Sequence, residues 1–295
     1  MTDHISRFSE EGTRFLPRKF QGFPEIKEAL IAGRMQAGFL VAPMAIALRS
    51  QGVPIKVVFL GHRYGSAVVV RADGPVRTVR DLAGRTVAIP SRFSDEHLIV
   101  LRAVERKGLT RDDVRLVEMP PPDVAGALAV GAIDAFSMGE PFPSQAEMGG
   151  FGRILFHARE VWPDYMSCVV VVREDVIETN PRAVQVLVDG IARSGLWLDE
   201  GVPHRDHAAD FVGRYYYQQP PAVLRWALTR DLMRVTYIYR SGAEETGLRL
   251  GARSDAAARA ARLVDRVRGV RGRAIRQGRD GGDGVEVRAG DRVAE

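Results

Sequence analysis

Two stretches of this chain are nearly the same phrase: ALIAGRMQAGFLVAP at residues 29–43 and ALAVGAIDAFSMGEP at residues 127–141. Both read Ala-Leu-x-x-Gly-x-x-(Gln or Asp)-Ala, and both end on a proline. Each opens in a helical pattern that stops at a glycine, Gly33 or Gly131, where a positive φ is expected. A short apolar run follows each glycine and predicts a buried strand. Each stretch therefore predicts a helix, a glycine stop, a strand and a loop.

The rest of the chain alternates in the same way. Apolar runs predict strands at 54–61, 66–72, 85–90, 114–119 and 167–175, and helical spacing predicts helices at 94–109 and 180–200. This alternation is typical of α/β proteins with mainly parallel sheets. The repeated phrase predicts two lobes of similar build, unless the match is chance among common residues. Ligands in such sheets bind beyond the carboxyl ends of strands, so the loops after both repeated strands are expected to face one cleft.

The bulk composition narrows the classes of protein. The 295 residues are 45% hydrophobic and 27% charged, with a formal net charge of +5, which fits a globular protein of one or two domains. The single cysteine, Cys168, excludes an internal disulfide. Apolar runs are too short to span a bilayer, and no block of like charges occurs. We therefore expect no nucleic-acid partner and no membrane insertion.

Signals for catalysis and metal binding are few. The sequence contains no G-x-S-x-G, H-E-x-x-H, Walker A or G-x-G-x-x-G pattern. We therefore expect no enzyme activity, no catalytic residue and no cofactor. His204, His207 and Asp210 have ligand-like spacing, but a solvated helix start is the better interpretation and no metal site is predicted.

Loops after predicted strands carry the candidate ligand-binding residues. Backbone N–H groups at the start of helix 94–109 favour an anion, with Ser94 as cap or contact and Arg92 as charge. Gly65 permits close approach of backbone to a ligand. Glu140 is an acid that binds an ammonium group, orients Arg92 or holds a cation. The structural alternatives are a plain helix cap, a hairpin turn and a salt bridge. The predicted ligand-binding residues are Pro43, Tyr64, Gly65, Ser66, Arg92, Phe93, Ser94, Glu140, Pro141 and Phe142.

Longer phrases carry a resemblance to a known family. They are VAIPSRFSDEHLIVLRAVERKGL from residue 87, the proline triplet with GAIDAFSMGEPF at 120–142, EVWPD at 160–164 and NPRAVQVLVDG at 180–190. Over about residues 7–239 the sequence resembles the nitrate/sulfonate/taurine/bicarbonate substrate-binding proteins of ABC importers. It is most similar to the nitrate- and bicarbonate-type branch.

This resemblance implies a fold, a ligand and a partner. The fold is two-lobed, of the periplasmic-binding-protein type II, and it closes on a small anion or zwitterion. The expected partner is an ABC transporter permease. The expected location is periplasmic or otherwise extracytoplasmic, but cytoplasmic if Met1 is the true start, because no signal peptide is written there. The lobes are expected at 1–72 with 170–240 and at 73–169, with crossovers near 70–78 and 163–170.

Both ends of the chain depart from the family pattern. The family begins with a strand and a helix before the segment that matches Phe8, so we interpret the chain as N-terminally truncated. Residues 241–295 are rich in Arg, Gly and Ala, which predicts a largely disordered tail. Members of the family usually continue past residues 234–237 with an apolar helical end, so the resemblance implies a frame shift after about Tyr239. Three alternatives stay open. The first is a cytoplasmic enzyme on the same fold, resembling the thiamine-pyrimidine synthases or menaquinone-pathway dehydratases. The others are the effector half of a transcription regulator and a non-functional truncated relative.

Overall fold

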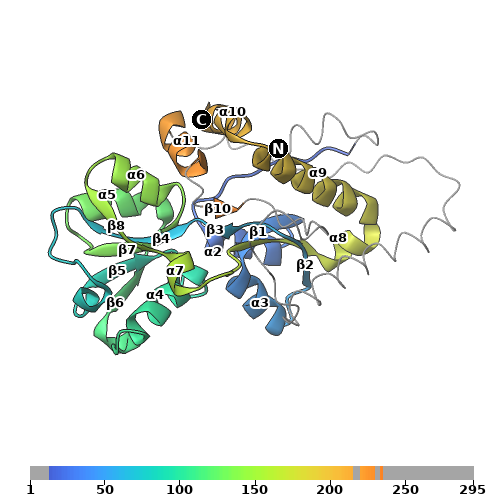
Figure 1. Ribbon diagram of the computed structural model, residues 1–295. Coiled ribbons are helices and arrows are strands. Elements are labelled where there is room, and N and C mark those ends of the chain that lie inside the picture. The colour runs from blue at the N-terminus through green and yellow to red at the C-terminus, as the bar shows by residue number, and fades with distance from the viewer. Residues whose placement is uncertain (1–12, 215–219, 230–232, 235–295) are drawn as a thin grey trace, which may run out of the picture.

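Two separate sheets divide the chain into two lobes, which lie side by side in Figure 1. The computed structural model describes residues 13–214, 220–229 and 233–234. The predicted tail at 241–295 and the segment around Phe8 lie outside the described residues. The two-lobed α/β architecture expected from the sequence is confirmed.

The first lobe contains a three-stranded sheet in the order β1-β9-β2. Strand β9 pairs antiparallel with both neighbours. Leu30, Leu40, Met44 and Val171 belong to the apolar cluster that holds this lobe together. The elements of the lobe are α2 (Phe23–Ile31), β1 (Ala37–Val41), α3 (Ala42–Ser50), β2 (Ile55–Leu60), β9 (Cys168–Arg173) and α8 (Glu174–Thr179).

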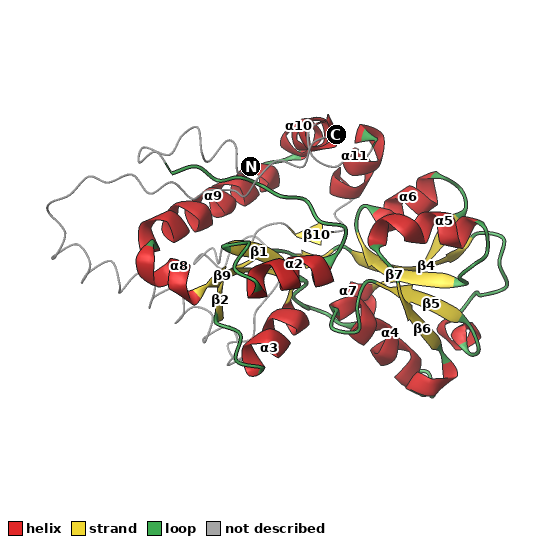
Figure 2. Ribbon diagram, turned by 180° about the vertical axis from the view of Figure 1, so that it is seen from behind, coloured by secondary structure: helices red, strands yellow, loops and turns green. Residues whose placement is uncertain are grey.

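The second lobe contains a five-stranded sheet in the order β6-β5-β7-β4-β8. Its two faces are covered by separate apolar clusters, one around Ile99 of α4 and one around Phe136 of β7. Figure 2 shows helices on both faces of this sheet. The elements are β4 (Ser66–Arg71), β5 (Thr86–Ile89), α4 (Asp95–Glu105), β6 (Arg115–Glu118), α5 (Val124–Ala129), β7 (Ala135–Gly139), α6 (Phe142–Met148), β8 (Gly152–His157) and α7 (Ala158–Val161), with short 3₁₀ turns η1 (Val79–Leu82), η2 (Arg111–Asp113) and η3 (Pro121–Asp123).

The sequence predicts mainly parallel sheets, but the structure contains both parallel and antiparallel pairs of strands. Among the described strands, the parallel pairs are β5 with β6 and β5 with β7. Strand β4 runs antiparallel to β7 and β8, and β9 runs antiparallel to β1 and β2. The reason is topological: β4 and β9 follow the two crossovers, so each enters its sheet from the other lobe rather than after a local helix.

The sequence-based lobe boundary at residues 72/73 needs correction. Strand β4 lies in the second sheet, so the first crossover is at 61–65 and not at 70–78. Four consecutive apolar residues of β4, from Ala67 to Val70, are at most 2% exposed. A strand buried on both faces belongs in the middle of a sheet. That sheet is the one of the second lobe, whereas the sequence places residues 66–72 in the first lobe. The second crossover, at 162–167, lies where 163–170 was expected.

Three C-terminal helices and a short strand add a further link between the lobes, beside the two crossovers. Helix α9 (Pro181–Asp199) lies above the first lobe in Figure 1, and α10 (Val202–Val212) and α11 (Pro221–Thr229) follow it. Helix α11 packs against α6 of the second lobe. Strand β10 (Met233–Arg234) pairs with β3 (Arg63–Tyr64) in the first crossover.

Candidate functional site

Loops from both lobes meet at the two crossovers. The backbone N–H of Ala42, next to Pro43, donates to the carbonyl of Ser167 over 2.8 Å. In the second lobe, the N–H of Glu140 donates to the carbonyl of Gly65 over 2.7 Å. The loops that the sequence placed at strand ends therefore lie around one junction, which is where a hinge between lobes must be.

At the start of α4, where the sequence predicts an anion site, the N–H groups of Arg92, Phe93 and His97 have partners inside the protein. Ser94 is fully buried and its hydroxyl accepts from the N–H of His97 over 3.2 Å, which confirms the cap. The Phe93 N–H donates to the hydroxyl of Ser91, and the Arg92 N–H donates to the carboxylate of Glu118. An anion that binds here has to replace these bonds. The side chains of Arg92 and Phe93 are exposed.

Tyr64 and Gly65 form the first crossover together with Ser66. Both Tyr64 and Gly65 have positive φ, at 62° and 85°. The Tyr64 hydroxyl donates to Asp164 of the second crossover over 3.1 Å, and the guanidinium of Arg63 donates to the same oxygen over 3.2 Å. Burial, followed by the charge of Asp164, raises the pKa of the Tyr64 hydroxyl. The two crossovers are thus tied by side chains, and the plain hairpin alternative is excluded because β2 and β4 lie in different sheets.

Glu140 stands at the start of α6, after strand β7. Its carboxylate accepts from the backbone N–H of Ser144 over 3.2 Å, so it satisfies one of the free N–H groups of that helix. Pro141 and Phe142 begin the helix and are half-buried. The hydrogen bond from the Glu140 N–H to the Gly65 carbonyl places Glu140, Pro141 and Phe142 next to the first crossover. Contact of these three residues with a ligand stays a prediction.

Two residues that sequence reasoning did not select lie at the centre of this arrangement. Asp95 and Glu96, the first two residues of α4, are only 1% and 3% exposed. The hydroxyl of Ser66 donates to Glu96 Oε1 over 3.2 Å, and that of Ser137 donates to the Glu96 carbonyl over 3.1 Å. Acids in a first helical turn are common on exposed helices, so the sequence offered no sign of burial.

Burial dominates the electrostatics of this carboxyl pair. It raises the pKa of Asp95, with the neighbouring charge of Glu96 as the second cause, and it raises the pKa of Glu96 as well. Burial likewise raises the pKa of the Tyr165 hydroxyl, which accepts from the N–H of Ser66 over 3.1 Å. Cys168, the first residue of β9, has its pKa raised by burial and then by the two acids. Burial therefore favours the neutral, protonated form of this carboxyl pair, which lies in a water-poor centre beside the crossovers.

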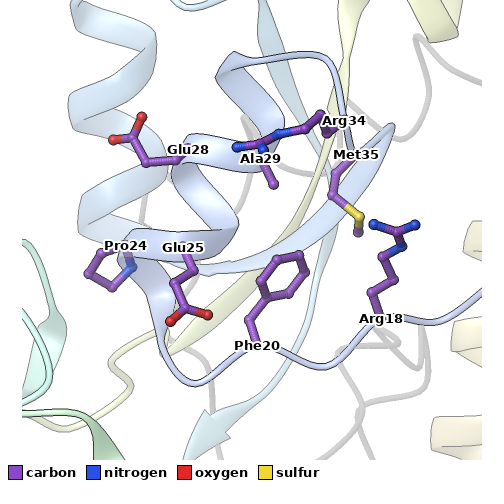
Figure 3. A pocket seen from close by; sticks show the side chains of 8 residues that line it. All are labelled: Arg18, Phe20, Pro24, Glu25, Glu28, Ala29, Arg34 and Met35. Carbon is purple, nitrogen blue, oxygen red and sulfur yellow. The ribbon is translucent and has the colours of Figure 1, made fainter. Parts of the chain in front are cut away.

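A pocket of about 450 Å³ lies elsewhere, beside α2 (Figure 3). Phe20 and Met35 line it, with arginines on one side and glutamates on the other. All of its lining residues lie between Arg18 and Met35, so the pocket is not shared between the two lobes. None of the predicted ligand-binding residues lines it, and we do not place the functional site there.

Among the described residues, no cluster of three or more His, Cys, Asp or Glu side chains is arranged to hold a metal ion. The ring of His204 stacks on Trp197 at 4.7 Å, which is a packing role for one of the residues with ligand-like spacing. In the same described segments, no helix is long and apolar enough to cross a membrane.

Two lobes joined by two crossovers, with loops of both around the junction, define the class of periplasmic-binding-protein-type folds. The alkanesulfonate-binding protein SsuA of Xanthomonas axonopodis pv. citri, bound to MOPS, has a similar fold, with a TM-score of 0.69 at 20% identity over 79% of each chain. The desulfurization enzyme DSZB aligns with a TM-score of 0.51 at 17% identity over 80% of this chain and 78% of that one. The fold therefore occurs in binding proteins and in an enzyme.

Sequence comparison identifies the family. The profile of the NMT1-like family matches residues 3–213. The chain is 29% identical to the taurine-binding periplasmic protein of Escherichia coli K12 over 76% of each chain. It is 25% identical to the bicarbonate-binding protein CmpA of Synechococcus elongatus over 38% of this chain and 25% of that one. The chain belongs to the NMT1-like family, as its motifs indicated.

Proposed function

We propose that the protein is the substrate-binding component of an ABC importer and that it takes a small anion or zwitterion between its lobes. The observation that carries this proposal is the convergence of loops from both lobes at the crossovers. A ligand that touches both lobes favours the closed arrangement over the open one, and a transporter permease can recognise closure. The names of the taurine-binding and bicarbonate-binding relatives support this class of ligand.

Binding without chemistry is part of the proposal. The sequence relatives that guide it are binding proteins, whereas the likeness to the desulfurization enzyme is one of fold alone. The enzyme alternative is therefore not favoured. The name of the taurine-binding periplasmic protein also supports action in the periplasm. A permease is the proposed partner, because a structure of similar fold is the ligand-binding component of an ABC-type import system.

The test is a ligand panel on the purified chain. Taurine, ethanesulfonate, nitrate and bicarbonate are titrated by calorimetry, and lobe closure is followed by small-angle X-ray scattering. We expect at least one of them to bind and to reduce the radius of gyration. Absence of binding by all four, with a cooperatively folded protein, contradicts the proposal.

A second titration tests the predicted site residues. Arg92→Ala and Glu140→Gln are expected to weaken the binding of whichever ligand the wild type takes, with little change in unfolding temperature. Arg111→Ala is the matched control, because the Arg111 side chain is 69% exposed and lies at η2, away from the junction. Unchanged affinity in both site variants shows that the ligand lies elsewhere.

A further inference from the structure

The carboxyl pair Asp95–Glu96 has more buried oxygen atoms than the described residues around it provide hydrogen bonds for. Both oxygens of Asp95 and the Oε2 of Glu96 are buried without a hydrogen-bond partner. The hydroxyl of Ser167 lies close enough to lower the pKa of Asp95, but it does not reach hydrogen-bond geometry. Among the described residues, neither carboxyl has an ion-pair partner. Burying an ionised carboxylate without a partner is costly, so the pair is either neutral, as its raised pKa values favour, or completed by a cationic group.

The surroundings of the pair suit a compact cation. Hydroxyl groups gather around the two acids from four different segments. Hydroxyl, carbonyl and carboxylate oxygens are the partners that ammonium groups and hard metal ions use. The four serines, Ser66, Ser94, Ser137 and Ser167, are each at most 3% exposed.

Gly139 leaves room beside Glu96 at the end of strand β7. A Cβ atom built there lies 3.7 Å from Glu96 Oε1 and 3.8 Å from the hydroxyl of Ser66, without a clash. There is therefore room for one heavy atom next to Glu96 Oε1 and the Ser66 hydroxyl oxygen. Gly139 is followed directly by Glu140 and is half-buried, so this space lies on the side of the predicted ligand loops.

We infer that Asp95 and Glu96 form a binding site for a compact cationic group at the junction of the lobes. Resting on the proposed function, the cation is the ammonium of a zwitterionic ligand or a free metal ion bound with the anion. The carboxyl pair binds the positive charge, Ser66 orients Glu96, and the crossover beside Ser167 brings the first lobe to the same point. A cation here lowers the repulsion between the two acids and ties the lobes together.

The experiment compares two ligands that differ in one charged group. Taurine and ethanesulfonate are titrated into the full chain by calorimetry, and calcium chloride and potassium chloride are titrated separately against choline chloride by thermal shift. The variants are Asp95→Asn and Glu96→Gln, which remove charge but keep shape. Glu105→Gln is the matched control, since Glu105 is exposed at the other end of the same helix. Circular dichroism checks the fold of each variant.

A cation site gives one of two results. Either the wild type binds taurine about tenfold or more tightly than ethanesulfonate, as a charge-assisted bond to a buried carboxylate implies, or calcium or potassium raises its unfolding temperature where choline does not. In both cases Asp95→Asn or Glu96→Gln removes the effect and Glu105→Gln keeps it.

Other results separate this inference from the proposed function. If both sulfonates bind equally in wild type and variants and no metal ion stabilises the chain, the pair is a structural acid pair and the inference is overturned while the function stands. If none of the anions binds but a metal ion acts through the pair, the site stands and the proposed function fails. An effect that survives both substitutions also overturns the inference.

Discussion

The two repeated stretches differ in their neighbours although they fold alike. Helix α2, Gly33 and β1 in the first lobe correspond to α5, Gly131 and β7 in the second. Strand β1 pairs antiparallel with β9 from Ala37 to Val41, as β7 pairs with β4 from Ala135 to Gly139. In both lobes the crossover strand ends in an arginine, Arg173 or Arg71, whose guanidinium covers the glycine.

Strands β1 and β7 differ in how many strands pair with them. Strand β7 lies between β4 and β5, whereas β1 pairs only with β9 among the described strands. Phe136 of β7, at the repeat position of Gly38, is 0% exposed, whereas Phe39 of β1, at the repeat position of Ser137, is 42% exposed. The local pattern therefore decides helix, stop and strand, and the number of neighbours decides how much each strand contributes to stability.

The largest expected effect comes from truncating one aromatic in each lobe. Phe136→Ala removes a fully buried ring from the cluster under α5 and α6 and is expected to cost about 3–5 kcal/mol of unfolding free energy. Phe39→Ala is expected to cost less than about 1 kcal/mol, because much of the ring already contacts water. Urea unfolding of both variants checks this. Equal losses in the two contradict the difference in burial.

The buried acids Asp95 and Glu96 are expected to make the free energy of unfolding depend on pH. The expected change is smaller than that caused by Phe136→Ala. The pKa values of Asp95 and Glu96 are raised in the folded protein, so their contribution is fully present below about pH 4, the unfolded range, and is lost as pH rises through the raised values. Tyr165 and Cys168 face the pair and stay neutral in this range, because burial raises their pKa values too.

The substitution Asp95→Asn removes part of the stability that wild type loses as pH rises. The unfolding free energy of Asp95→Asn relative to wild type, measured with urea, is therefore expected to increase between pH 5 and pH 8. Asp112→Asn, at a side chain that is 92% exposed, is the control and is expected to show no such trend. An offset of Asp95→Asn that is the same at both pH values contradicts the raised pKa.

The glycine stops test how far the two repeats are equivalent. Gly33 and Gly131 have φ of 71° and 75°, so alanine at either is expected to cost about 1–2 kcal/mol. The added Cβ also meets an arginine, at 3.0 Å for Gly33 and 2.6 Å for Gly131. Gly126→Ala, inside α5 with open space around it, is expected to stabilise by about 0.5–1 kcal/mol. If Gly131→Ala leaves the free energy of unfolding unchanged, the positive φ assigned to Gly131 is contradicted.

The smallest effect is expected at the arginines that cover those glycines. Arg173 donates to the carbonyl of Leu30 over 3.0 Å and pairs with Asp175, and Arg71 pairs with Asp73. Arg173→Ala is expected to cost about 1 kcal/mol, and Arg71→Ala less, because its side chain is more exposed and its ion pair is largely solvated. Thermal unfolding of the two variants in parallel checks the order.

Much of the local structure was predictable from the residues. The helix at 94–109, the glycine stops and the strands at 54–61 and 66–72 follow from apolar spacing and caps. The cap at Ser94 was predicted from the same pattern. The partners of β4 were not, because an apolar strand carries no mark of which sheet it enters.

The sequence by itself determined the class of fold, the repeated helix–glycine–strand unit and the family, since these depend on spacing and motifs along the chain. Only the tertiary structure decided that β4 joins the second sheet and that Asp95 and Glu96 are buried together. Burial arises when segments far apart in the chain, such as Ser66 and Ser167, close over the same helix start. No local pattern contains that information, because the free energy of a charge depends on what surrounds it in space.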